Sequence, residues 1–158
     1  MQAHVDGLRM RGIDAVAIDI PKKRAEDAVS AYLAKSGSGR DVAIGGQSYG
    51  GRVASLLAAD GEHDFAGLVL FSYPLHRPGG PEWEPRSAHW PQIRCPVLFL
   101  GGDADPFADI ELLRRAIAER LPTAQLFTYP RLGHTLKPVL DDALDRTAAF
   151  LEGLGQKA

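Results

Sequence analysis

The stretch Gly45-Gly46-Gln47-Ser48-Tyr49-Gly50-Gly51 decides how this chain folds. It follows an apolar run at 42–44 and precedes residues 52–59, whose spacing of apolar side chains predicts a helix. A glycine-flanked serine between a strand and a helix fits the G-x-S-x-G pattern, in which a sharp turn exposes the serine hydroxyl. We expect Gly46 and Gly50 to lie where a Cβ would collide as strand and helix cross. The alternative interpretation is a glycine-rich turn that only packs a helix on a sheet.

The composition is that of an ordinary globular protein. The 158 residues suit one domain, 1–158, and hydrophobic and charged residues make up 45% and 24% of them. A formal net charge of −2 predicts neither nucleic acid nor an anionic membrane as a partner. The single Cys95 excludes an internal disulfide framework and a cluster of thiolate metal ligands, which fits a reducing, cytoplasmic location. No apolar run reaches the roughly 18 residues needed to span a bilayer.

Helical patterns and apolar runs alternate along the chain. Strands are expected at 13–19, 41–45, 66–73, 95–101 and 124–129. Helices are expected at 2–11, 22–35, 49–59 and 107–120, and from Pro138 onward. This alternation predicts an α/β fold, a three-layer αβα sandwich with a mainly parallel sheet of about five strands. Right-handed crossovers then place the carboxyl end of every strand at one edge of the sheet, where ligands bind.

The 74–94 segment interrupts this alternation with five prolines, two tryptophans, two histidines and three arginines. One interpretation is an irregular surface excursion. The other is a cap that walls a substrate pocket, because long loops beside a rigid sheet often carry specificity. The side chains then expected to line the pocket are Tyr73, Leu75, Trp83, Trp90 and Phe107.

Three groups suited to acyl transfer follow predicted strands, in the order Ser48, Asp105, His134. In the fold that uses such a serine turn, the nucleophile, the acid and the histidine follow one another along the chain in this order. A histidine can take the serine proton during attack, and a carboxylate holds the imidazole in the required tautomer. The N–H of Tyr49 would face the oxyanion. Asp103 is the alternative acid, but it sits nearer the strand and is expected to tie its loop by accepting backbone N–H groups.

At these positions the chain resembles the α/β-hydrolase superfamily, and within it the dienelactone-hydrolase-like branch of small serine hydrolases. The resemblance is carried by the residues 46–52, 101–107 and 133–135 and covers the chain from about residue 12 onward. It implies Ser48 as nucleophile, Asp105 as acid and His134 as base, and an acyl-enzyme intermediate in the cleavage of an ester or similar bond. Dienelactone hydrolases proper use cysteine where this chain has Ser48, so their substrate is not carried over.

The chain departs from that superfamily at its start. Members normally begin with further strands, one of which ends in a loop that supplies a second oxyanion-hole N–H. This chain opens on what resembles the helix after that loop, so it is expected either to start late, at an internal methionine, or to be a reduced form of the fold. In the reduced form, 13–19 would pair with 41–45, or another chain would fill the gap. Since an unpaired edge invites a partner strand, a homodimer is one expected arrangement.

Two functions follow from the sequence. The first is a serine hydrolase, of carboxylesterase or thioesterase type, that acts on a small acyl ester or thioester with no metal and no organic cofactor. The second is a catalytically weak or inactive binding or scaffold domain that keeps the serine turn for packing. Acyl transfer to an acceptor other than water is a variant of the first that the sequence leaves open.

Overall fold

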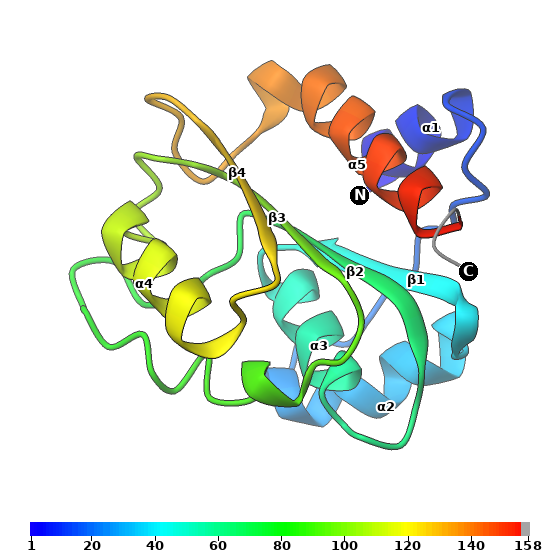
Figure 1. Ribbon diagram of the computed structural model, residues 1–158, viewed down its shortest axis with the longest axis horizontal. Coiled ribbons are helices and arrows are strands. Elements are labelled where there is room, and N and C mark those ends of the chain that lie inside the picture. Colours follow the sequence, from blue (N-terminus) through cyan, green and yellow to red (C-terminus); the bar gives the residue numbers. More distant parts are fainter. Residues whose placement is uncertain (156–158) are drawn as a thin grey trace.

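Four parallel strands form one sheet in the order β1-β2-β3-β4 in the computed structural model, which describes residues 1–155 (Figure 1). The strands are β1 (Gly39–Gln47), β2 (Phe65–Phe71), β3 (Val97–Gly102) and β4 (Gln125–Tyr129). All three neighbouring pairs are parallel, so every strand ends at the same edge of the sheet. The central strands β2 and β3 are apolar along nearly their whole length because both of their faces are covered.

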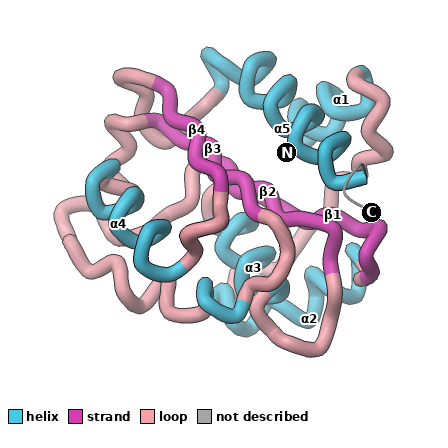
Figure 2. The backbone as a smooth tube through the Cα atoms, in the orientation of Figure 1, coloured by secondary structure: helices cyan, strands magenta, loops and turns pink. Residues whose placement is uncertain are grey.

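Helices cover both faces of the sheet (Figures 1 and 2). One face carries α2 (Ala25–Ser36), α3 (Tyr49–Ala58) and α4 (Ile110–Arg120), whose buried side chains join the larger hydrophobic cluster. The other carries α1 (Gln2–Met10) and α5 (Leu140–Gly155), which pack with the second cluster. Two short 3-10 helices, η1 (Trp90–Gln92) and η2 (Lys137–Val139), complete the described elements. The expected three-layer α/β architecture is confirmed.

The strand expected at 13–19 is absent, so the sheet of the described residues has four strands instead of about five. An extended segment joins a sheet only where its backbone groups pair with a neighbouring strand. Here helix side chains take two of the carbonyls instead, Arg9 Nε donating to the oxygen of Ala15 at 2.8 Å and Lys35 Nζ to that of Asp19. Val16 in the middle of the segment is 70% exposed.

The 74–94 segment is irregular, but its largest apolar side chains are buried. Leu75, Trp83, Trp90 and Ile93 are 0–6% exposed and belong to the larger hydrophobic cluster. Trp90 packs against Phe99 of β3, with ring centroids 5.1 Å apart. The segment is therefore fixed to the body of the domain by apolar burial along much of its length.

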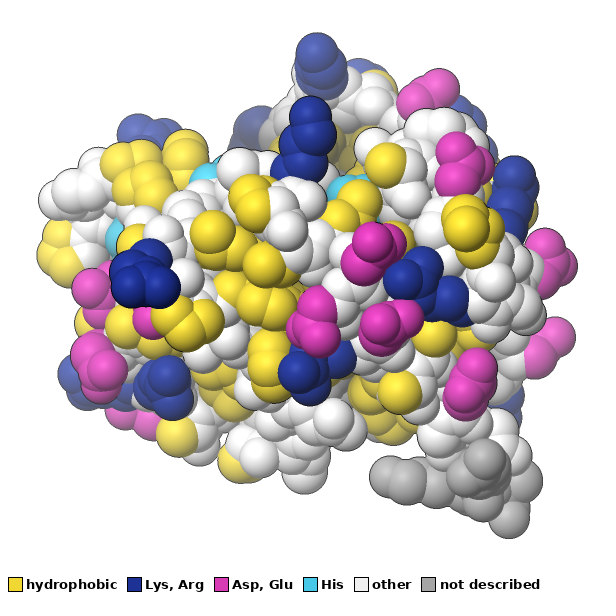
Figure 3. Space-filling model, turned by 90° about the horizontal axis from the view of Figure 1, so that it is seen from above, with side chains coloured by type: hydrophobic (Ala, Val, Ile, Leu, Met, Phe, Trp, Pro, Cys, Tyr) yellow, Lys and Arg dark blue, Asp and Glu magenta, His cyan; other side chains and the backbone are white. Residues whose placement is uncertain are grey.

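Acidic and basic side chains are interspersed over the face seen in Figure 3, with apolar groups between them. Among residues 1–155, no helix combines the length and the hydrophobicity that crossing a membrane requires.

β1 and α3 cross in contact at the serine turn, and two glycines make this possible. A Cβ on Gly46 would lie 2.6 Å from the amide nitrogen of Gly51, and one on Gly51 would lie 2.9 Å from the carbonyl oxygen of Gly46. A Cβ on Gly50 would have no atom of the described residues within 4 Å, apart from its chain neighbours and the backbone of its own helix. The prediction for Gly46 is confirmed and that for Gly50 is wrong, because the first turn of α3 directs Gly51 toward the strand.

The two glycines flanking Ser48 should therefore respond oppositely to alanine. Gly46→Ala is expected to lower the free energy of unfolding by about 2–3 kcal/mol, since the added methyl group overpacks rigid backbone. The matched control Gly50→Ala, in open space within a helix, should be neutral or stabilise by roughly 0.5–1 kcal/mol. Urea unfolding of both variants measures the difference. Equal losses in the two variants would contradict the close crossing.

Candidate active site

Ser48 sits between the end of β1 and the start of α3 with an unusual backbone. Its φ is 51° and its ψ −119°, a conformation that a side-chain-bearing residue adopts only where its surroundings impose it. Its N–H donates to the carbonyl of Phe71 on β2 at 2.9 Å, and its carbonyl accepts the N–H of Arg52 on α3 at 3.0 Å. The strand and the helix thus hold both ends of the strained residue.

The side chain of His134 lies between Ser48 and Asp105. Its Nε2 is 2.8 Å from Ser48 Oγ and its Nδ1 is 2.7 Å from Asp105 Oδ2. Asp105 is 4% exposed, and its Oδ1 accepts the N–H of Phe107 at 2.8 Å. An ionised carboxylate only accepts, so we assign the Nδ1 proton to the contact with Asp105. Nε2 is then free to accept the proton of the Ser48 hydroxyl.

The loops that carry Asp105 and His134 are fastened to each other. Asp103 Oδ1 accepts the N–H of Arg131 at 2.7 Å, and the N–H of Ala104 donates to the carbonyl of Leu132 at 2.9 Å. A Cβ on Gly102 would overlap that same Leu132 carbonyl, so the loops meet at backbone distance. Asp103 ties the loop as expected, which leaves Asp105 to reach His134.

The other expected site residues fall into two groups. The ring of Phe107 lies against that of His134, with centroids 4.5 Å apart, and Tyr49 occupies the first position of α3. The N–H of Tyr49 points out of the helix end without an intrahelical partner. The remaining four side chains are 0–5% exposed and lie in the core instead of along an open pocket; they are Tyr73, Leu75, Trp83 and Trp90.

His76, in the 74–94 segment, holds the loop that carries Asp105, a role that no sequence pattern indicated. Its Nε2 accepts the N–H of Asp109 at 2.8 Å, and its Nδ1 lies 2.8 Å from the carbonyl of Arg77. Its own N–H donates to the carbonyl of Phe107 at 3.0 Å. These bonds fix the backbone at Phe107 and at Asp109, and the N–H of Phe107 in turn orients Asp105. His76 thus helps to position Asp105.

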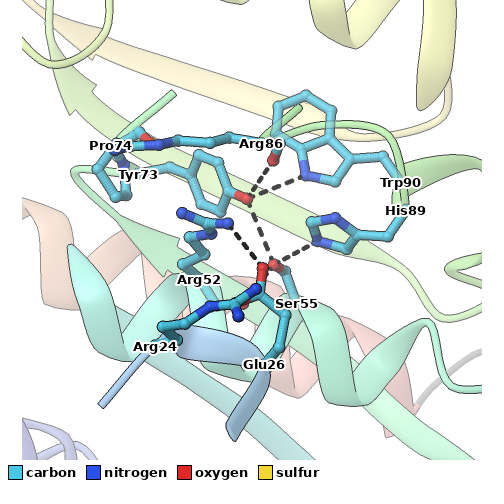
Figure 4. A network of polar contacts seen from close by, with 9 residues as sticks. All are labelled: Arg24, Glu26, Arg52, Ser55, Tyr73, Pro74, Arg86, His89 and Trp90. Atoms are coloured by element: carbon cyan, nitrogen blue, oxygen red, sulfur yellow. Dashed lines mark hydrogen bonds and ion pairs between the residues drawn. The ribbon is translucent and has the colours of Figure 1, made fainter. Parts of the chain in front are cut away.

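A second polar network fastens the same segment to α3 (Figure 4). Ser55 donates its only hydroxyl proton to the carbonyl of Arg52 at 2.7 Å, so His89 Nε2, also at 2.7 Å, is the donor to Ser55. Tyr73 donates its hydroxyl to the carbonyl of Arg86 at 2.6 Å and lies 3.4 Å from Trp90 Nε1. Burial, and next the charge of Arg52, lower the pKa of His89 to about 4.

Among residues 1–155, no three His, Cys, Asp or Glu side chains gather closely enough to hold a metal ion.

The chain matches the family described as "Alpha/beta hydrolase domain" over residues 18–152. A crystal structure of an uncharacterized protein from Bacillus cereus ATCC 10987 superposes with a TM-score of 0.67 at 16% identity, covering 96% of this chain and 54% of that one. Paleococcus ferrophilus monoacylglycerol lipase gives 0.65 at 16% identity, with coverage of 86% and 77%. Dienelactone hydrolase from Anabaena variabilis ATCC 29413 gives 0.57 at 19% identity, with coverage of 72% and 49%.

These identities establish a common fold and nothing more specific. The chain spans about half the length of the Bacillus and Anabaena structures, 54% and 49%. The activity, substrates and partners of those longer proteins are therefore not properties of this chain by similarity alone.

The buried network predicts an acid-sensitive stability. The pKa of His89 is about 4 in the folded state against 6.5 for a free imidazole, so folding favours the neutral ring. The stability gained is present above pH 6.5 and is lost as the pH falls toward 4, by at most about 3 kcal/mol. Between these pH values, wild type should therefore lose more unfolding free energy than His89→Gln, which cannot take up the proton. Parallel pH profiles of the two proteins would refute the assignment.

Proposed function

Because this chain belongs to the alpha/beta hydrolase domain family, we propose that it is a serine hydrolase that cleaves a small ester or thioester. The observation that carries the proposal is the hydrogen-bonded relay from Asp105 through His134 to Ser48, with links of 2.7 and 2.8 Å. The family match supports hydrolysis in general. The residues, the ester substrate and a cytoplasmic location are part of the proposal.

In the proposed reaction, Ser48 Oγ attacks the acyl carbonyl while His134 Nε2 takes the hydroxyl proton. His134 then returns this proton to the leaving alcohol or thiol as its bond to the acyl carbon breaks, which leaves an acyl-enzyme on Ser48. A water molecule attacks next, gives its proton to His134, and the acid departs as Ser48 regains the proton. Asp105 stabilises the imidazolium formed in both halves, and because it is buried its charge acts with little solvent screening.

The developing oxyanion is proposed to accept the N–H of Tyr49. This group is at the positive end of α3, and the strained backbone of Ser48 sets its direction relative to Oγ. Phe107, packed on His134, is the aromatic side chain best placed to contact the acyl group. Of the side chains expected to line the substrate pocket, it is the one retained in this role.

A fluorophosphonate probe tests the nucleophile directly. Wild type should be labelled at Ser48, whereas Ser48→Ala should show no labelling although it remains folded. Asp105→Asn should slow labelling by about 10³-fold or more, since the imidazole loses the partner that fixes its tautomer. Ser36→Ala, which alters a hydroxyl at the far end of α2, serves as the control. A folded wild type that resists the probe would favour the non-catalytic binding or scaffold domain.

The hydrogen bonds from His76 to the loop that carries Asp105 lead to a separate prediction. His76→Ala should lower kcat for an activated ester about tenfold with little change in KM, because it removes the side-chain bond to Asp109 that steadies the loop of Asp105 but keeps the main-chain bond to Phe107. His76→Gln, which can still accept the N–H of Asp109, should recover part of this loss. His63→Ala, at an exposed pair with Asp60, is the control. A loss confined to thermal stability, with kcat intact, would make His76 purely structural.

A further inference from the structure

Two arginines lie near one carboxylate beside the first turn of α3, and the charges of two further arginines act close by. Arg24 precedes α2, Arg52 lies on α3, and Arg77 and Arg86 belong to the 74–94 segment. We refer to these as the arginine cluster. The carboxylate is Glu26 in the first turn of α2, which lies 3.0 Å from Arg52 Nη2 and 3.9 Å from Arg24 Nε.

Arg52 lies in the middle of the cluster and is only partly neutralised. Its side chain is 22% exposed, and one of its terminal nitrogens pairs with Glu26. Its Nε is buried and has no hydrogen-bond partner among the described residues. Figure 4 shows its guanidinium between Glu26 on one side and the ring of Tyr73 on the other. Five donors on Arg52 thus meet fewer acceptors than they could use.

Arg86 has an acceptor, but no carboxylate among residues 1–155 forms an ion pair with it. Its Nη1 donates to the carbonyl of Pro74 at 3.1 Å. Burial, followed by the charges of Arg52 and Arg77, lowers the pKa of this guanidinium, so its surroundings are positive. Glu84 of the same segment lies toward α4 instead, because its carbonyl accepts Arg120 Nη1 at 2.9 Å. Two partly buried cations therefore lie together with a shortage of negative charge, an arrangement that an anion would stabilise.

The backbone of Arg52 and the carbonyl of Pro74, which accepts from Arg86, both lie a few residues from Ser48 or from its backbone partner on β2. The N–H of Arg52 donates to the carbonyl of Ser48 at 3.0 Å, one turn into α3. The N–H of Ser48 donates to Phe71 at 2.9 Å, and Gln47 pairs with Phe71 in the sheet. Pro74, which receives Arg86, follows Phe71 by three residues at the same edge. An acyl group on Ser48 that extended toward the 74–94 segment would run along this edge in the direction of Pro74, whose carbonyl accepts from Arg86.

We propose that Arg86 and Arg52 form an anion subsite beside Ser48, and that the preferred substrates are esters carrying a carboxylate or phosphate group. The inference rests on the proposed hydrolase function and names its substrate class. Arginine suits the role because its planar donors match both oxyanions in pairs. Glu26 occupies one terminal nitrogen of Arg52, so Arg86 is the more available of the two arginines for the ligand.

Two esters of equal length and leaving group test the subsite. Mono-4-nitrophenyl adipate carries a terminal carboxylate, and 4-nitrophenyl hexanoate ends in a methyl group. Wild type should favour the adipate ester by about tenfold or more in kcat/KM. Arg86→Gln should lower that preference about tenfold, whereas Arg86→Lys should retain a part of it. Arg94→Gln, an exposed arginine 3.6 Å from Asp64, should leave the preference unchanged. A preference that is absent in wild type, or identical in Arg86→Gln, overturns the subsite.

A binding measurement separates this inference from the hydrolase proposal. Isothermal titration of Ser48→Ala with adipate and with inorganic phosphate should show binding of one or both, and this binding should be lost in Ser48→Ala/Arg86→Gln. The anion that binds identifies the oxyanion recognised. Arg86-dependent binding without turnover of any ester would support the subsite and refute the hydrolase. Turnover of both esters without anion binding would support the hydrolase and refute the subsite. Thermal unfolding of each variant establishes that it is folded.

Discussion

The close crossing of β1 and α3 is the constraint on which the site depends. Gly46 and Gly51 let the strand and the helix approach until their backbones touch, and no larger residue fits at either position. The chain between them must then reverse within a few residues, and Ser48 takes the strain with a φ of 51°. The strained conformation persists because the N–H of Ser48 donates to Phe71 of β2 and its carbonyl accepts the N–H of Arg52 of α3.

The parallel sheet supplies the other half of the site. Since all four strands end at one edge, residues far apart in sequence meet there with little extra structure. The loops after β3 and β4 are joined by backbone contacts at Gly102 and by the carboxylate of Asp103. Asp105 and His134 thus hold their positions relative to each other, while the strained turn places Ser48 relative to both.

Features that depend on local interactions were predicted from the sequence, whereas features that depend on contacts between distant segments were not. Local patterns identified the helices and the buried strands, and the order of Ser48, Asp105 and His134 predicted side chains that the structure brings within hydrogen-bonding distance. The segment 13–19 looked like a strand because periodicity reports side chains and not pairing partners. Trp83 and Trp90 were expected along a pocket but are buried, since composition does not say which way an irregular segment turns.

The contacts of His76 and His89 could not be predicted from composition. His76 and His89 lie in the same irregular segment, yet each bonds to a different element, the first to the acid loop and the second to α3. Together they span the segment between β2 and β3 and fix it at two points. Because His89 is held through Ser55, one turn beyond Arg52, the same network that anchors the segment also brings Arg86 next to Arg52. A rearrangement of this network would therefore change both the stability of the domain and the proposed anion subsite, so the two properties are coupled.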